Sequence, residues 1–298
     1  MTLRAIILGA AAGGGLPQWN CGCENCNLAR RGEIPAQTQS SLAVSPDGRN
    51  WAILNASPDI RIQLGNTPVL FPTGLREMPV QSVLVTNGDI DHVAGLLTLR
   101  EMQPFSLFAT NGIHDVIAEN PIFDALNASV VKRRPILLNE PFELVTNLTA
   151  TLFPVPGKVP LYLEGDQVQT DLVGEQTVGV ALRTQGKTAY YIPGCAALTP
   201  ELRAQLEGAN LLFFDGTLWQ NDEMVRAGLG QKTGKRMGHM SMDGPDGSIA
   251  EFANMQIGRK VFVHMNNTNP VLRPGSTENA RAQAKGWTIG QDGMEITL

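Results

Sequence analysis

The stretch from residue 83 to residue 99, VLVTNGDIDHVAGLLTL, constrains the fold more than any other part of this chain. It begins as an apolar β-strand, passes through a polar turn and continues into an amphipathic helix. The polar residues of the turn are Asn87, Asp89, Asp91 and His92. Alternating side chains of an extended turn project to one side, and converging oxygen and imidazole groups suit a divalent metal ion. The alternative is that the aspartates only cap the helix and interact with its dipole.

Two later apolar strands also end in a polar side chain. The run NLLFFDG ends at Asp215, and the run KVFVHMNN ends at His264. A charged or imidazole group at the mouth of a buried strand needs a partner, because burying it alone is costly. Each residue by itself fits a hydrogen-bonded structural role. Together with Asp91 and His92 they supply two imidazoles and two carboxylates, which predicts a mononuclear metal site with positions left for other ligands.

The two remaining histidines have different contexts. His239 lies in the glycine-flanked loop KRMGHMSMDG, where a general acid or base, a further metal ligand and a residue without a role all remain open. His114 lies at the start of a helix expected over residues 113–119, among polar residues. We expect His114 at the surface or at the helix cap.

A cysteine cluster near the N-terminus predicts a second metal site. Cys21, Cys23 and Cys26 lie within six residues of one another, too close to cross-link the fold by disulfides. Three thiolates at this spacing suit a closed, structural zinc site. The fourth ligand lies outside the motif, and the candidates are Asn267 or a neighbouring side chain, His239 and Cys195. Zinc binding would stabilise the loop over residues 9–35.

Composition excludes several classes of protein. The net charge of −5, without a run of Lys or Arg, is unlike that of a general nucleic-acid binder. No segment approaches the ~18 consecutive apolar residues of a membrane span. The apolar N-terminal run is broken by glycines at 13–15, which predicts a strand over residues 3–8 and a glycine-rich turn beside a ligand pocket, not a signal peptide or a dinucleotide site. Clustered thiols fit a reducing compartment, so we expect a cytoplasmic protein.

Strand-like segments recur along the whole chain, in two groups before and after about residue 150, with helical patterns between them. One helix is expected over residues 200–207, after a Thr199 cap. Another is expected over residues 248–255, with Ser248 as N-cap and Glu251 completing a capping box. No composition change marks a boundary, so we expect a single α/β domain over residues 1–298, built from two sheets faced by helices.

This order of strands and polar residues resembles the metallo-β-lactamase superfamily. The usual signature of that superfamily reads His-x-His-x-Asp-His, and here Asn87 and Asp89 replace the two leading histidines. The resemblance implies an αββα sandwich of two facing mixed sheets flanked by helices. It also implies that the first of two metal positions is degraded, which argues against ordinary two-metal hydrolysis. The second position is kept by Asp91, His92, Asp215 and His264.

Over residues 6–270 the chain is more closely similar to the coenzyme PQQ biosynthesis protein B family. The segments that carry the similarity are ILGAAAGGGLPQWNCGCENC, LNASPDI, TNGDIDHVAGLL, YIPGC, FFDGTLW, MGHMSM and HMNNTNP. The resemblance implies a role in making pyrroloquinoline quinone (PQQ) from a peptide precursor. The implied activity is Fe(II)- and O₂-dependent hydroxylation of the tyrosine ring in a Glu–Tyr unit. The alternatives are a carrier that helps PQQ or its precursor reach the periplasm, and a metal-dependent hydrolase.

The resemblance also implies roles for individual residues. Iron would be held by Asp91, His92, Asp215 and His264, and a structural zinc by Cys21, Cys23 and Cys26, with Asn267 as candidate fourth ligand. His239 would donate a proton or orient the substrate, and Asp89 would act as a weak ligand or as a carboxylate behind the ligands. The substrate would be a small peptide-derived precursor, and its carboxylates need a basic contact among Arg61, Arg76, Lys158 and Arg273. Other PQQ biosynthesis proteins are candidate partners, and both a monomer and a homodimer remain open.

Overall fold

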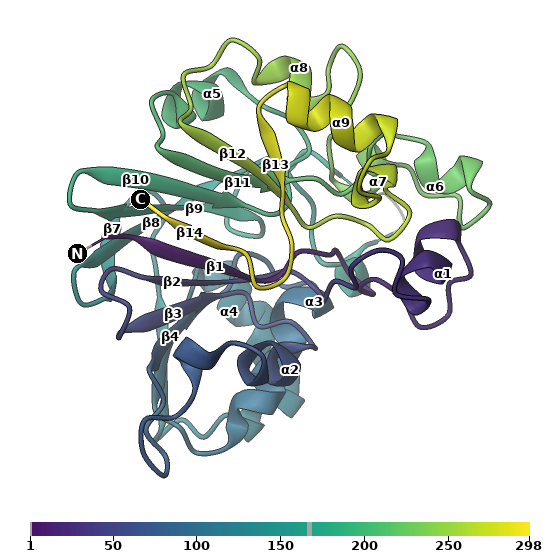
Figure 1. Ribbon diagram of the computed structural model, residues 1–298. Helices are drawn as coiled ribbons and strands as arrows, with labels where there is room; N and C mark the ends of the chain where they lie inside the picture. The colour runs from purple at the N-terminus through teal and green to yellow at the C-terminus, as the bar shows by residue number, and fades with distance from the viewer. Residues whose placement is uncertain (1, 166–168) are drawn as a thin grey trace.

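The computed structural model describes residues 2–165 and 169–298. Two seven-stranded β-sheets pack together, and helices cover their outer surfaces (Figure 1). The buried apolar side chains of both sheets belong to one continuous core. The predicted α/β architecture of two mixed sheets flanked by helices is therefore confirmed.

The first sheet has the strand order β14-β1-β2-β3-β4-β5-β6. Its strands, in chain order, are β1 (Arg4–Gly9), β2 (Ser41–Ser45), β3 (Trp51–Leu54), β4 (Val80–Leu84), β5 (Phe105–Ala109), β6 (Val131–Pro135) and β14 (Glu295–Thr297). Strands β3 to β6 are parallel to one another, and the other pairs are antiparallel. The strand expected over residues 3–8 is β1.

The second sheet has the strand order β13-β12-β11-β10-β9-β8-β7. Its strands are β7 (Pro141–Val145), β8 (Leu148–Pro154), β9 (Val178–Thr184), β10 (Lys187–Ile192), β11 (Leu211–Asp215), β12 (Arg259–Val263) and β13 (Trp287–Ile289). Strands β10 to β13 are parallel, and β7 to β10 are joined by antiparallel pairs. The change of sheet falls between β6 and β7, slightly earlier than predicted, and β14 returns to the first sheet.

Short helices connect and cover the sheets. The α-helices are α1 (Glu24–Arg30), α2 (Ile60–Gly65), α3 (Ile90–Val93), α4 (Asn111–Ala118), α5 (Pro200–Leu206), α6 (Glu223–Arg226), α7 (Gly234–Met237), α8 (Ser248–Glu251) and α9 (Thr277–Ala284). The 3₁₀ helices are η1 (Pro68–Leu70), η2 (Ala94–Arg100), η3 (Pro121–Ala125), η4 (Leu161–Leu163) and η5 (Pro270–Leu272). No described helix combines the length and the apolar character that crossing a bilayer would require.

Two of the helix predictions need correction. The helix expected from His92 onward is divided into α3 and the 3₁₀ helix η2, because the Gly95 N–H donates to the Ala56 carbonyl, outside the helix. A Cβ on Gly95 would lie 2.1 Å from the Ser57 carbonyl oxygen, so only glycine allows this close approach. The predicted capping box at Ser248 is wrong. Gly247 is the N-cap of α8, and the Ser248 N–H donates to the Ser241 carbonyl.

The other capping prediction is confirmed. The Thr199 side chain accepts a hydrogen bond from the Leu202 N–H at the start of α5, with Pro200 in the first turn. The parallel strands β4, β11 and β12 carry the residues that the sequence singles out at or just beyond their carboxyl ends. Ligand sites of open α/β sheets form at this edge.

Candidate functional site

The turn after β4 and the loop after β12 bring three predicted ligands together. Ligand atoms of Asp91, His92 and His264 all lie within 4.8 Å of one another. The Oδ2 atom of Asp91 lies 3.1 Å from His264 Nε2 and 3.6 Å from His92 Nε2. Residues 173 positions apart in the sequence thus meet in one group of two imidazoles and one carboxylate.

A second group shares His264 and adds residues from other loops. Asp215, His239 and His264 also offer ligand atoms within 4.8 Å of one another. The Asp215 Oδ2 atom lies 2.6 Å from His239 Nδ1. Asp215, predicted with the other ligands, therefore falls into a neighbouring group that overlaps the first at His264. His239, whose role the sequence left open, lies beside Asp215.

Sequence reasoning missed Thr217, which connects the two groups. Its Oγ1 atom lies 2.6 Å from Asp215 Oδ1, 2.8 Å from His264 Nδ1 and 3.1 Å from His239 Nδ1. A hydroxyl has one proton and two lone pairs, so it can donate to Asp215 while accepting from the His264 Nδ1–H. That arrangement leaves His264 Nε2 free to face Asp91. The only sequence signal was a hydroxyl residue two positions after a strand-ending aspartate.

The local charges favour ionised carboxylates and act in opposite directions on the two imidazoles, those of His92 and His264. Burial raises the pKa of Asp91, but His92 and His264 outweigh burial and hold it well below its usual range. The pKa of Asp215 is lowered in the same way by His239 and His264. Burial lowers the pKa of His92, whereas the pKa of His264 is raised because its hydrogen bond to Asp91 outweighs burial.

His92 supplies the test of whether a metal ion fits here. Its side chain is 2% exposed, and neither ring nitrogen has a hydrogen-bond partner among the residues that the structure describes. A buried polar atom without a partner costs free energy. A neutral imidazole with a free lone pair is a good ligand for a transition-metal ion, so the donor set fits a metal.

The two groups open onto a cavity of about 320 Å³. Asn87, Asp89 and Asp91 all line it, as does Gly13 of the glycine-rich turn, as predicted. Asp89 is outside both ligand groups, and its Oδ1 atom accepts a hydrogen bond from the Leu161 N–H. Asp89 is the N-cap residue of α3 but makes no side-chain cap hydrogen bond, and Asp91 lies in the first turn, where its charge also suits the helix dipole.

Among the four candidate basic contacts, Lys158 lines this cavity. Its Nζ atom lies 2.9 Å from Glu164 Oε1, and Arg236 lies 2.9 Å from the other oxygen of Glu164. These two cations outweigh burial and hold the pKa of Glu164 at about 2. An exposed second lysine, Lys232, also lines the cavity. Arg273 pairs instead with Glu24.

The cysteine cluster forms a separate, closed group. The sulfurs of Cys21, Cys23 and Cys26 lie within 4.8 Å of one another at the start of α1. Burial, together with the neighbouring sulfurs, raises the pKa of Cys23 to about 11. Three thiolates this close together repel one another unless a cation compensates their charge, and a bound zinc ion would do so.

Asn267 occupies the fourth corner of this cluster. Its side-chain amide lies 3.2 Å from the Cys21 sulfur, 3.5 Å from Cys23 and 3.3 Å from Cys26. Asn25 holds the Asn267 segment in place by donating to its backbone carbonyl at 2.9 Å. The other candidates lie elsewhere, since the Cys195 N–H donates to Asp215, beside His239. Asn267, the candidate fourth ligand, therefore lies beside the three sulfurs, and its amide nitrogen Nδ2 is the atom that faces them.

His114 differs from the prediction. Its side chain is buried in α4, and Thr110 supplies the helix cap. Both ring nitrogens lack hydrogen-bond partners, and burial lowers the pKa of the imidazole. The prediction failed because this face of α4 packs against the protein interior.

The sandwich and its strand-end metal groups define a protein of the metallo-β-lactamase class. The model of the β-lactamase superfamily domain matches residues 50–265. A diphosphatase from the PhnP family shares the fold, with a TM-score of 0.70 at 17% identity over 100% of this chain and 98% of that one.

Closer relatives narrow this class to one family. Coenzyme PQQ synthesis protein B of Ruegeria pomeroyi is 58% identical over 296 residues, covering 99% of this chain and 100% of the relative. The protein of the same name from Methylorubrum extorquens is 55% identical over 299 residues, with the same coverage. A crystal structure of Zn²⁺-bound PqqB from Methylobacterium extorquens has a TM-score of 0.98 at 55% identity, covering 99% of this chain and 100% of that one. The chain belongs to the coenzyme PQQ synthesis protein B family.

Proposed function

We propose that this protein acts in PQQ biosynthesis as an Fe(II)- and O₂-dependent hydroxylase of the tyrosine ring in a Glu–Tyr precursor. The family name supports the pathway. The observation that carries the chemistry is the buried His92 with two unpartnered ring nitrogens, beside Asp91 and His264 on the wall of an open cavity. Two imidazoles and one carboxylate with open positions are the donor set of non-haem Fe(II) oxygenases.

In this proposal Asp91, His92 and His264 hold the iron, and Asp215 completes the set. Iron, when bound, supplies the binding and reduction of O₂. Both oxygens of Asp215 accept hydrogen bonds from backbone or side-chain donors, so its negative charge is fixed in place. Thr217 holds His264 in the orientation that directs Nε2 toward Asp91.

Lys158 and Lys232 bind the carboxylates of the precursor. Lys158 is the more strongly positioned of the two, since its side chain is 11% exposed and pairs with Glu164. Arg236 on the other side of Glu164 leaves this trio with a net positive charge. A cationic wall opposite a metal group would orient an acidic, aromatic substrate with its ring toward the metal.

His239 serves as proton donor or acceptor for the phenol. Its Nδ1 atom is engaged by Asp215, so its exchangeable position toward the substrate is Nε2. The contact with the Asp215 carboxylate holds the His239 ring in a fixed orientation. Asp89 lies behind the ligands, and its side chain accepts a hydrogen bond from the Leu161 backbone N–H.

The cysteine cluster holds zinc for structure, not for chemistry. Its three thiols and the Asn267 amide leave no position open to a substrate, and Asn267 also lies only three residues after His264. A zinc ion would therefore link the N-terminal loop to the strand end that carries an active-site ligand. The clustered free thiols support a reducing, cytoplasmic location.

A metal-dependent hydrolase is the second candidate, because Asp215, His239 and His264 form a group that could hold another ion. Metal analysis separates the two. One iron and one zinc per chain support the hydroxylase, whereas two zinc ions at the active site support the hydrolase.

The decisive experiment incubates anaerobically purified, iron-loaded protein with a Glu–Tyr-type precursor and ascorbate, and then admits air. Each hydroxylation inserts one oxygen atom of O₂ into the ring and releases the other as water, with two electrons and two protons taken from ascorbate. Mass spectrometry should detect a product heavier by whole oxygen atoms, and ¹⁸O₂ should label it. A precursor of unchanged mass would refute the hydroxylase. If, in addition, a metal-free His92→Ala protein still supported PQQ export in cells, the carrier role would be favoured.

A further inference from the structure

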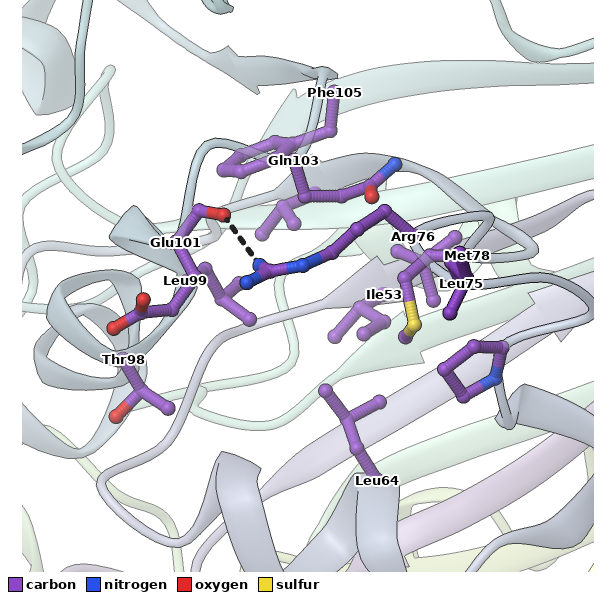
Figure 2. A pocket seen from close by; sticks show the side chains of 13 residues that line it. Ile53, Leu64, Leu75, Arg76, Met78, Thr98, Leu99, Glu101, Gln103 and Phe105 are labelled. Atoms are coloured by element: carbon purple, nitrogen blue, oxygen red, sulfur yellow. Dashed lines mark hydrogen bonds between the residues drawn. The ribbon is translucent and has the colours of Figure 1, made fainter.

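A second cavity, of about 250 Å³, lies apart from the histidines on the helix-covered face of the first sheet (Figure 2). Ile53 of β3 and Val83 of β4 are paired neighbours in the sheet and form its floor. The walls come from α2, from η2, from β5 and from the loop between η1 and β4. The other apolar lining residues used here are Leu64, Met78, Leu99 and Phe105.

This cavity opens to solvent, because Pro72, Leu75, Arg76 and Glu101 of its lining are exposed. Its floor on the sheet is buried and apolar. An apolar cavity of ~150 Å³ is enough to bind benzene. The present cavity has room for a molecule of roughly ten non-hydrogen atoms.

The polar feature of the cavity is Arg76. Figure 2 shows its side chain extending across the cavity toward Glu101. Its Nη1 atom donates to the Glu101 backbone carbonyl at 3.2 Å, and within residues 2–165 and 169–298 this is its single hydrogen bond. The Glu101 carboxylate pairs with Arg100 instead. A guanidinium has five N–H donors, and a carboxylate is the partner that two of them fit best.

We propose that this cavity binds a small amphipathic monocarboxylate, with an aliphatic chain or single ring among the apolar side chains and the carboxylate on Arg76. The apolar lining of the cavity disfavours a ligand with several charges. The Arg76 guanidinium, which has no acidic partner among the described residues, favours a ligand with a negative head group. The site is separate from the metal groups and does not depend on the proposed hydroxylase.

Octanoate tests the proposal, with 1-octanol as a neutral ligand of the same length. Isothermal titration should give saturable one-to-one binding of octanoate to the wild-type protein. Arg76→Gln should weaken octanoate about tenfold and leave 1-octanol unchanged. Arg61→Gln, on the exposed face of the nearby α2, should change neither. No saturable octanoate binding, or equal loss in both arginine variants, would overturn the proposal.

Filling the cavity provides the second, independent test. Leu64 is half-buried at the cavity wall, so Leu64→Trp should occupy the space with little damage to the core and abolish binding of both ligands. Amide chemical shifts of the wild-type protein should move first around Leu99 and Phe105 on adding octanoate. Shifts confined to the neighbourhood of His92 would place the ligand at the metal cavity and refute the assignment.

Discussion

The two metal-type clusters of this protein are built in opposite ways. The cysteine cluster takes three donors from six consecutive residues and adds one distant amide, Asn267. The histidine–aspartate cluster takes its donors from three strand ends and two sheets, with His264 shared between two groups. The first cluster is closed on all sides, whereas the second lines a cavity of about 320 Å³.

The difference separates a cluster that can only stabilise the fold from a cluster that can bind a substrate. A cluster with all positions filled by protein can lower only the free energy of folding, because no substrate can reach its ion. A cluster with open positions can exchange ligands, but its donors must be held by the surrounding fold. The segment from His264 to Asn267 joins the two, since it contributes a donor to each.

The largest effect is expected from a substitution in the histidine–aspartate cluster. His92→Ala should remove active-site metal and lower turnover of the precursor by at least about 10³-fold, because a ligand is lost from the metal. Metal analysis and product mass spectrometry measure both, while circular dichroism should show a folded protein.

The matched control for this change is His114→Ala. His114 is likewise buried with unpartnered ring nitrogens, but it belongs to neither ligand group. The His114→Ala variant should keep its full metal content. Normal iron and turnover in the His92 variant would show that the ligand assignment is wrong.

A substitution in the cysteine cluster should lower the stability of the folded protein instead. Cys23→Ser should release zinc and lower the free energy of unfolding by about 3 kcal/mol, which corresponds to roughly 5 °C in Tm for a chain of this length. Turnover should fall only in proportion to the unfolded fraction. Cys195→Ser, at a buried cysteine outside the cluster, should retain zinc. A zinc-replete Cys23 variant of normal Tm would contradict the structural role.

A substitution at His239 should separate a loss of catalytic rate from a loss of metal. His239→Ala should keep iron and lower turnover about 10²-fold, because the proton at Nε2 is no longer available. Single-turnover kinetics and iron content should be measured on the same preparation. If iron disappears with the imidazole, His239 is a ligand; if the rate is unchanged, it has no role in the reaction.

The smallest expected effect concerns Asp292, which accepts hydrogen bonds from Thr38 and from the Ala10 N–H. Burial outweighs these bonds and raises the pKa of Asp292 to about 6. The folded state therefore holds this proton up to higher pH than the unfolded chain. The resulting stability is full below about pH 4 and lost as the pH rises through about 6.

Asp292→Asn should remove this pH dependence. The wild-type protein should gain about 2 kcal/mol relative to the variant when the pH is lowered from 7 to 4, measured by urea unfolding at constant ionic strength. Metal content at pH 7 should be the same in both. An equal pH slope in both proteins would show that Asp292 does not titrate in this range.

Much of the site could be predicted because each donor is marked locally. Asp215 and His264 end apolar runs, and Asp91-His92 follows another, so the pattern of burial identified them. The capping prediction at Ser248 failed because α8 begins one residue earlier than predicted, with Gly247 as its N-cap. The Ser248 N–H donates to the Ser241 carbonyl of the preceding loop.

The sequence by itself determined the α/β class, the strand ends that carry polar donors and the clustered thiols, because these depend on periodicity and on short spacings. Only the tertiary structure decided that His264 serves two groups, that Thr217 connects them, that Lys158 faces the cavity while Arg76 lies over another, and that His114 is buried. These features depend on which loops meet when two sheets pack, and packing is fixed by contacts between residues far apart in the chain.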